Sequence, residues 1–272
     1  MISVISLPKK ILQYVFLILC SIISAFPLLW MIIAATNKSI DVIRGRIFPG
    51  SYISENMKTL LAKTNLWQAM GNSFKNSILL TVLTLAICSL AGYGFEIYHD
   101  EAKDKLMSIL LLAMMVPQVA TIVPLFHMVS TMGFLNSIWG FALPTISTPF
   151  MIMMFRQSAR SFPHDIIESA RIDGLNEFQI FFKMFIPIMS PTYAAATTIT
   201  FMNSWNSYLW PKIIMVNQKA QTMPMLISNM IGGYVTDYGE LMLGVLFCTL
   251  PTIIIFFFLQ NRFADGITGA VK

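Results

Sequence analysis

Long runs without charged residues alternate with short polar segments along this chain. Residues 106–155 contain no Asp, Glu, Lys or Arg, and neither do residues 184–211. About 20 apolar residues in a helix cross the roughly 30 Å hydrocarbon core of a bilayer. The polar piece STMGFLNS divides the first of these runs in two. The pattern therefore predicts an all-α membrane protein with six transmembrane helices, at about 11–36, 76–96, 106–128, 137–155, 188–211 and 241–260.

The composition supports the bilayer as the solvent. Of the 272 residues, 56% are hydrophobic and 11% are charged, whereas soluble domains are about 45–50% apolar and about 25% charged. The net charge of +5 comes with no basic run or stripe, so nucleic acid is not an expected partner. The three cysteines lie in apolar stretches, and their odd number and spacing indicate neither a disulfide framework nor a metal site.

Six spans would place both termini on one side of the membrane. Ten of the 18 Lys and Arg residues then lie on the side of the termini and eight on the other. Basic residues are in excess on the cytoplasmic side, so we expect both termini in the cytoplasm of a bacterial cell. The long segment 38–75 would face outward as a small subdomain or an interfacial helix.

One segment concentrates charge between the fourth and fifth predicted spans. The chain has 31 charged residues, 18 basic and 13 acidic, and eight of them lie in the segment 156–183. Within it, SFPHDIIESARIDG predicts a short helix with Ser161 as its cap and Pro163 in its first turn. Gly174 stands where a left-handed closing residue is favoured.

A second helix should follow this turn directly. Asn176 is expected to cap the phenylalanine-rich segment EFQIFFKMFIP, which Pro187 would end. Helix, glycine turn and second helix together form either a rigid cytoplasmic lever for docking or a solvated connector between two spans. The residues alone leave these two interpretations open.

The same segment resembles the EAA motif of the membrane subunits of bacterial ATP-binding-cassette importers. That motif reads E-A-A, three residues, G, nine residues, I-x-L-P. The chain has Glu168-Ser169-Ala170, then Gly174, then Met184-Phe185-Ile186-Pro187 at the same spacing. The segments FMNSWNSYLWP (201–211) and FADGITGAVK (263–272) are similar to the carbohydrate branch, in particular to the shorter permease of maltose-type importers.

This resemblance implies a set of partners. The loop 157–187 would dock in a cleft of a cytoplasmic ATPase present in two copies, beside a sister permease and an external or periplasmic sugar-binding protein. ATP and magnesium would be bound by the ATPase, so no cofactor is expected on this chain. Its tail, Gly269–Lys272, is either a second contact with the ATPase or a frayed end. The residues implied in coupling are Ile166, Ile167, Glu168, Ala170, Arg171, Asp173, Gly174 and Pro187.

A candidate substrate path lies in NSWNSYLWP, toward the outer end of the fifth span. At helical spacing Asn203, Asn206 and Trp210 share a face, and Tyr208 lies close by. Amides bond sugar hydroxyls, and aromatic rings stack on sugar faces. The alternative is an aromatic belt of Trp205, Tyr208 and Trp210 at the water interface.

The last outer loop, 217–240, is polar and contains a Gly232-Gly233 pair followed by Tyr234. The resemblance implies a contact between this loop and the external binding protein. The alternative is a plain connector.

The energy source should lie outside the membrane spans. Carriers coupled to ions need ionisable groups inside their spans, and His127 is the only ionisable side chain in the run 106–155. The chain has no Walker G-x-x-x-x-G-K-S/T motif and no protease or hydrolase motif, so it is not expected to be an enzyme. We predict a sugar-importing permease, for a disaccharide or oligosaccharide; a stand-alone carrier or channel for a small polar solute is the alternative.

Overall fold

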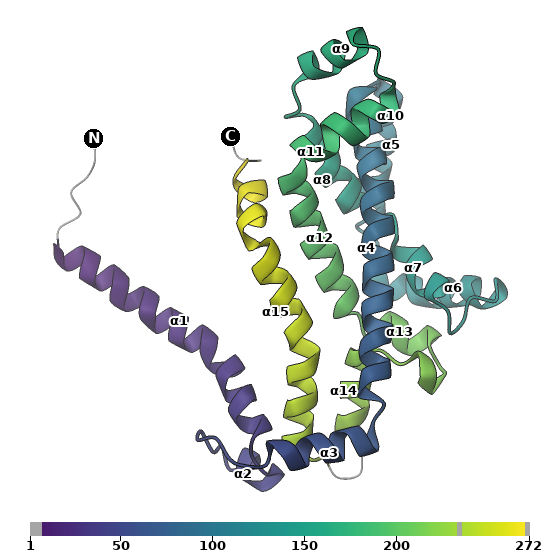
Figure 1. The fold of residues 1–272 in the computed structure, drawn as a ribbon. Coiled ribbons are helices and arrows are strands. Elements are labelled where there is room, and N and C mark those ends of the chain that lie inside the picture. Colours follow the sequence, from purple (N-terminus) through teal and green to yellow (C-terminus); the bar gives the residue numbers. More distant parts are fainter. Residues whose placement is uncertain (1–6, 233–235, 270–272) are drawn as a thin grey trace. The chain divides into compact units, whose positions relative to one another are not determined.

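The computed structural model describes residues 7–232 and 236–269, and every regular element in those ranges is a helix (Figure 1). The chain divides into two compact units. Unit 1 comprises Met1–Leu66 with Ile227–Thr249, and unit 2 comprises Trp67–Leu226 with Leu250–Lys272. A helical membrane fold satisfies all its backbone groups within each segment, as a bilayer requires.

Unit 1 contains a long apolar helix and two short ones. An 18-residue stretch of the long helix, within Lys10–Ala35, is only 6% buried inside the chain. Apolar side chains on all sides of this helix are therefore exposed to lipid or to a partner. The elements are α1 (Leu7–Ala35), α2 (Ser39–Ile43), α3 (Ile53–Lys63) and the first part of α15 (Tyr238–Gly269).

Hydrogen bonds tie the segments of unit 1 together where α1 ends. The Asn56 Nδ2 donates to the carbonyls of Ala35 and Asn37, at 2.9 and 3.0 Å. Lys63 Nζ lies 2.8 Å from a carboxylate oxygen of Glu240, whose side chain is only 8% exposed. The segment 38–75 predicted as an outer subdomain thus contains ordered helices bonded to the start of α15.

Unit 2 is a set of helices around three apolar clusters, which lie at successive levels along α4. Its elements are α4 (Leu66–Ile97), α5 (Glu101–Ala113), α6 (Gln118–Thr131), α7 (Ile138–Ala142), η1 (Leu143–Thr145), α8 (Pro149–Ala159), α9 (His164–Ile172), α10 (Glu177–Ile180), the π-helix η2 (Phe181–Phe185), α11 (Ile186–Ile188), α12 (Ser190–Trp205), α13 (Leu209–Ile214), η3 (Gln218–Ala220), the first part of α14 (Met223–Ile231), whose end belongs to unit 1, and the last part of α15.

The spans predicted from the charge-free runs differ in how they appear in the structure. Within the described residues, three helices are long and apolar enough to cross a membrane, namely Lys10–Ala35, Leu66–Ile97 and Tyr238–Gln260. Two further spans are possible as bent pairs, α5 with α6 at 100° and α7–η1 with α8 at 54°.

The third predicted span, 106–128, is therefore wrong as a straight helix. It breaks before Pro117, which lacks the N–H that would continue the ladder and carries an extended ψ of 130°. The fifth, 188–211, contains the 16-residue α12, which is shorter than a full crossing. The count of six spans stays a prediction.

Charged side chains meet at the end of α4 that carries Glu96. Arg156 of α8 is 4% exposed, and its guanidinium lies 3.1 Å from Glu96 and 2.5 Å from Asp104 of α5. Arg160 reaches the same Glu96 oxygen at 3.3 Å. A buried charge is tolerated when it is paired in this way, and the pairing joins α4, α5 and α8 next to the charged loop.

Candidate functional site

Helix α9 carries the residues of the EAA-like motif, and it begins later than the sequence predicted. It starts at His164, and Pro163 is the residue before its first turn, with an extended ψ of 119°. Ser161 is not a cap: its hydroxyl donates to the carbonyl of Ser158 at 2.7 Å. Proline sets the entry angle here, because its fixed φ suits a helix start. Asp165 lies in the first turn, where a negative charge is favourable.

The end of α9 has the geometry expected from Gly174. This glycine has φ +82°, and the N–H groups of Gly174 and Leu175 donate to the carbonyls of Arg171 and Ala170 at 3.1 and 3.0 Å. This is a Schellman ending, in which a left-handed residue closes the helix. It fixes the direction in which the chain leaves α9.

A reciprocal cap starts the next helix two residues later. Gln179 N–H donates to the Asn176 side chain at 2.9 Å, and Asn176 N–H donates to the Gln179 side chain at 3.0 Å. The predicted end at Pro187 is wrong: helical residues continue from Glu177 through η2 and α11, with a turn only at Met189 before α12. Pro187 itself lies within α11, directly after the π-helix η2.

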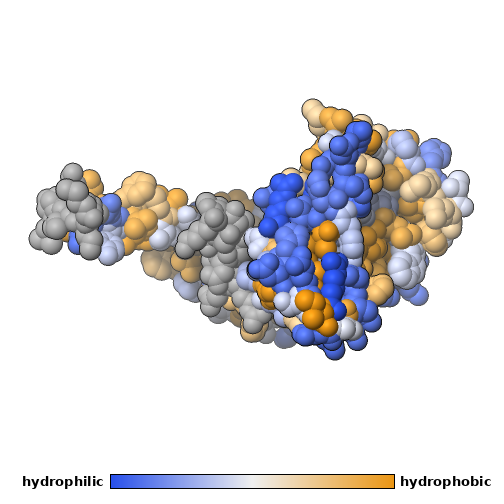
Figure 2. Space-filling model, turned by 90° about the horizontal axis from the view of Figure 1, so that it is seen from above, coloured by the Kyte–Doolittle hydropathy of each residue, from blue (hydrophilic) through white to orange (hydrophobic). Residues whose placement is uncertain are grey.

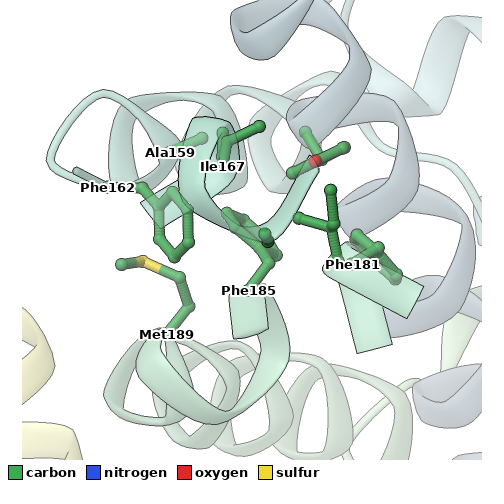
Figure 3. Packing of buried hydrophobic residues seen from close by; sticks show 9 residues of the cluster. Ala159, Phe162, Ile167, Phe181, Phe185 and Met189 are labelled. Atoms are coloured by element: carbon green, nitrogen blue, oxygen red, sulfur yellow. The ribbon is translucent and has the colours of Figure 1, made fainter. Parts of the chain in front are cut away.

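One face of α9 is buried inside the protein itself. Ile167 and Ala170 are 2% and 3% exposed and belong to a cluster with phenylalanines of the following helix. Figure 3 shows Ile167 pointing toward Phe185, with Phe162 and Met189 beside it. The rings of Phe162 and Phe185 lie 5.5 Å apart, a spacing typical of stabilising aromatic pairs.

This packing corrects the expectation, implied by the resemblance, that the isoleucine side chains of this helix fill a cleft of the ATPase. Ile167 and Ala170 are not available to fill the cleft of another protein, and Ile166 is partly buried against the same cluster. The helical period puts these positions on the face that the chain's own core needs. They hold α9 in place instead.

The other face of α9 is exposed and mostly polar. Viewed onto this end, Figure 2 shows hydrophilic side chains gathered together with a few hydrophobic ones among them. Glu168 and Asp173 are exposed, and the Ile172 side chain is 87% exposed. Sequence reasoning missed Ile172, although its position outside the 166–167–170 stripe was a signal that it faces outward. A single exposed isoleucine is common on protein surfaces and does not by itself identify a contact site.

Arg171 and Glu177 connect the two helices of the turn. The Arg171 Nε donates to a Glu177 carboxylate oxygen at 2.8 Å, and hydrogen bonds from Arg171 and then Tyr98 lower the pKa of the Glu177 carboxyl. Burial, followed by the Glu177 carboxylate, raises the pKa of the Tyr98 hydroxyl. Arg171 thus braces α9 against α10, next to the end of α4, while its side chain remains 45% exposed.

A second candidate site is a cavity of about 640 Å³ within unit 2. Helices α4, α6, α8 and α12 contribute to its wall, together with the turn after α12 and parts of η1 and α13. Its lining residues are Leu80, Thr84, Gln118, Val119, Ile122, Leu125, Phe141, Pro144, Thr145, Thr148, Met151, Thr200, Asn203, Ser204, Ser207, Tyr208, Leu209 and Trp210.

The cavity brings together three of the four residues predicted for a substrate path. Asn203, Tyr208 and Trp210 line it, and Asn206 does not. The helical spacing assumed for these residues is wrong, because α12 ends at Trp205 and α13 begins at Leu209. The chain turns at Asn206, which closes α12.

The structure also corrects the aromatic-belt alternative. Trp205 and Trp210 are 1% and 6% exposed, so neither lies as a ring at a lipid–water boundary. Trp205 stacks on Phe201 at 5.8 Å, and the Trp210 Nε1 donates to the Gly140 carbonyl at 3.2 Å. Tyr208, 39% exposed, is the ring of this group that the cavity presents to a ligand.

Other predicted contacts lie partly outside the described residues. Gly232 is exposed at the end of α14, whereas Gly233 and Tyr234 lie outside the described residues, as do residues 270–272 of the tail. Among described side chains no group of three His, Cys, Asp or Glu residues could hold a metal ion.

Comparison with known proteins agrees with these features. Residues 99–269 match the family model of the binding-protein-dependent transport system inner membrane component. The chain is 38% identical to the lactose transport system permease protein LacG of Rhizobium radiobacter, covering 96% of each chain. It is 33% identical to the arabinooligosaccharides transport system permease protein AraQ of Bacillus subtilis, covering 97% of this chain and 96% of that one.

The fold is shared with a solved structure. A chain from the crystal structure of a bacterial ABC transporter that imports the acidic polysaccharide alginate matches with a TM-score of 0.81 at 19% identity, covering 94% of this chain and 96% of that one. At this identity the likeness concerns the fold.

Proposed function

Because the chain belongs to the family of binding-protein-dependent transport system inner membrane components, we propose that it is the sugar-translocating permease subunit of an ATP-driven importer in a bacterial cytoplasmic membrane. The relatives named for lactose and for arabinooligosaccharides support a disaccharide or short oligosaccharide as the solute. The chain itself is not an enzyme; hydrolysis of ATP belongs to a partner.

One observation carries the coupling role, namely a short helix that is rigidly anchored on one face and exposed on the other. Ile167 and Ala170 anchor α9 in the chain's own core, while Glu168, Ile172 and Asp173 are exposed on its other side. We infer that this exposed face docks in a cleft of the ATPase. Its two carboxylates would meet basic or donor groups there, and Ile172 would supply an apolar contact.

The remaining partners follow from the same proposal. A sister permease would complete the pathway, two ATPase copies would bind ATP and magnesium, and an external binding protein would deliver the sugar, in part to the loop 217–240. Both termini and the loop 157–187 would face the cytoplasm. No cofactor is proposed on this chain.

The decisive experiment reverses a charge on the exposed face of α9. Glu168→Lys and Ile172→Asp should insert into the membrane at normal levels, because neither side chain is buried, but should lose co-purification with the ATPase and sugar uptake. Gln179→Glu is the control, since it keeps an acceptor for the Asn176 N–H. Full uptake and full ATPase retention in both variants would show that α9 is only a connector.

Topology has its own test. A cysteine at position 176, in a chain without its three native cysteines, should not react with an impermeant reagent applied outside intact cells. Efficient labelling from outside would overturn the topology and the docking role together. Uptake in liposomes that hold this chain alone would favour the stand-alone carrier instead.

A further inference from the structure

We propose that the cavity of unit 2 is a saccharide-binding subsite on this chain that accepts uncharged sugar rings and excludes acidic ones. The inference rests on the proposed import of a sugar. It adds that this subunit touches the sugar directly, and it states the charge class of the solute.

The first support comes from buried hydroxyls that the protein leaves unused. Thr84, Thr200 and Ser204 line the cavity and are 1%, 7% and 6% exposed. Their hydroxyl oxygens have no hydrogen-bond partner among the described residues. A buried hydroxyl without a partner is unfavourable, and a ligand in the cavity would supply the hydrogen bonds that these three groups lack.

The same helix shows what a threonine does when it faces only protein. Thr197 and Thr198 of α12 donate to the carbonyls of Tyr193 and Ala194, four residues earlier, at 2.7 and 2.9 Å. This back-bonding satisfies a hydroxyl within its own helix. Thr200 and Ser204, on the same helix, do not use it. Among the serines and threonines of α12, the two whose buried hydroxyls have no partner in the described part of the chain are the two that line the cavity. Outside the lining, Ser77 and Thr81 of α4 are also buried without a partner among those residues.

The second support is the charge of the lining. None of its 18 residues is Asp, Glu, Lys, Arg or His. Hydroxyls and amides, such as those of Gln118 and Asn203, both donate to and accept from sugar hydroxyls. A sugar carboxylate or phosphate would lose its hydration here without meeting a cation, which is strongly unfavourable. The lining therefore selects against acidic sugars.

Size and shape are compatible with a sugar. A volume of about 640 Å³ lies within the roughly 300–1,000 Å³ of small-molecule sites. The ring of Tyr208 and the apolar side chains of Val119 and Ile122 give the wall non-polar patches. Such patches suit the C–H faces of sugar rings, while the hydroxyls of α4 and α12 suit their edges.

The test measures whether sugars shield the cavity from a thiol reagent. Asn203→Cys, with Cys20, Cys88 and Cys248 replaced by Ala, is purified in complex with the sister permease and the ATPase. Reaction with an uncharged maleimide is followed without nucleotide and after vanadate trapping, so that both access states are sampled. Lactose and arabinotriose serve as neutral probes, and lactobionate as the acidic one.

Either neutral probe should slow labelling in at least one state, and lactobionate at equal concentration should not. Adding Thr200→Val or Ser204→Ala should raise the half-protecting concentration by about 2- to 10-fold, the worth of one hydrogen bond. Thr198→Val is the matched control, because this buried threonine lies on the same helix outside the lining, and it should leave protection unchanged.

Several outcomes would overturn the subsite. These are equal protection by lactobionate, no protection by either neutral sugar, or the same effect from Thr198→Val as from Thr200→Val. If a lining variant does not assemble, the comparison of neutral and acidic probes in the Asn203→Cys complex still decides. Failure here leaves ATPase retention and the effects of Glu168→Lys intact, so it is distinguishable from failure of the proposed function.

Discussion

The α9 region and the cavity of unit 2 treat their polar groups in opposite ways. Around α9, several polar side chains bond to one another: Arg171 bonds Glu177, and Asn176 and Gln179 cap one another. In the cavity no side chain is charged, and three buried hydroxyls have no partner among the described residues. The polar side chains near α9 bond to each other, whereas the three hydroxyls of the cavity remain available to bond a ligand.

The difference fits the two tasks proposed for these regions. A helix that passes motion from one protein to another must not yield where it is attached, so its inner face is packed and its turn is bonded. A pathway for a polar solute must exchange hydrogen bonds with whatever passes. Four substitutions test this contrast.

The largest effect should come from the packing beneath α9. Phe185 is fully buried, and its truncation in Phe185→Ala should lower the free energy of unfolding by about 3–5 kcal/mol through lost contacts and a residual cavity. Phe182→Ala, three residues earlier in the same π-helix but with its side chain 58% exposed, should change it little. Thermal unfolding of the purified protein measures both, and similar losses would mean that the cluster is not what anchors α9.

Arg156 should come next. Arg156→Met leaves Glu96, whose side chain is only 16% exposed, without its nearest cation, and should cost about 2–4 kcal/mol, less than for a fully buried pair because Arg160 still contacts Glu96. Arg160→Met removes a half-exposed contact at 3.3 Å and should cost under about 1 kcal/mol. Equal effects in the same unfolding assay would contradict the ranking by burial.

Gly174→Ala separates backbone strain from contact. A β-carbon there would meet no atom within 4 Å, so the cost of about 1–2 kcal/mol should come from φ +82° alone. Gly133→Ala has the same open surroundings and φ +73°, and so should destabilise the protein equally. Only Gly174→Ala should reduce ATPase retention, and equal retention in the two variants would remove the special role of the α9 ending.

The smallest effect should be the pH dependence of the Arg171–Glu177 pair. Because the folded pKa of Glu177 is lowered, the pair stabilises the protein above the carboxyl's ordinary value of about 4.3, and this is lost as pH falls through the lower folded value. Both side chains are nearly half exposed, so the contribution is below about 1 kcal/mol. Arg171→Met should remove it between pH 6 and pH 3, and an unchanged pH profile would show that the pair is not formed in solution.

Much of the α9 region could be read from the chain. Gly174 and Asn176 take the conformations that their residue types favour, because a left-handed closing residue and a helix cap are decided within a few neighbouring positions. The helical membrane class follows equally from the charge-free runs, since the bilayer admits few other solutions. The helix ending and cap follow from neighbouring residues, and the helical membrane class follows from the bilayer as solvent.

Which side chains meet depends on the packing of segments that are distant in the sequence. Ile167 and Ile172 are equally apolar, and packing against Phe185 is what buries one and leaves the other exposed. Likewise Thr198 and Thr200 are the same residue on one helix, but only Thr200 faces the cavity, because α4, α6 and α8 come together there from distant parts of the chain. Burial depends on those neighbours, which no local pattern specifies.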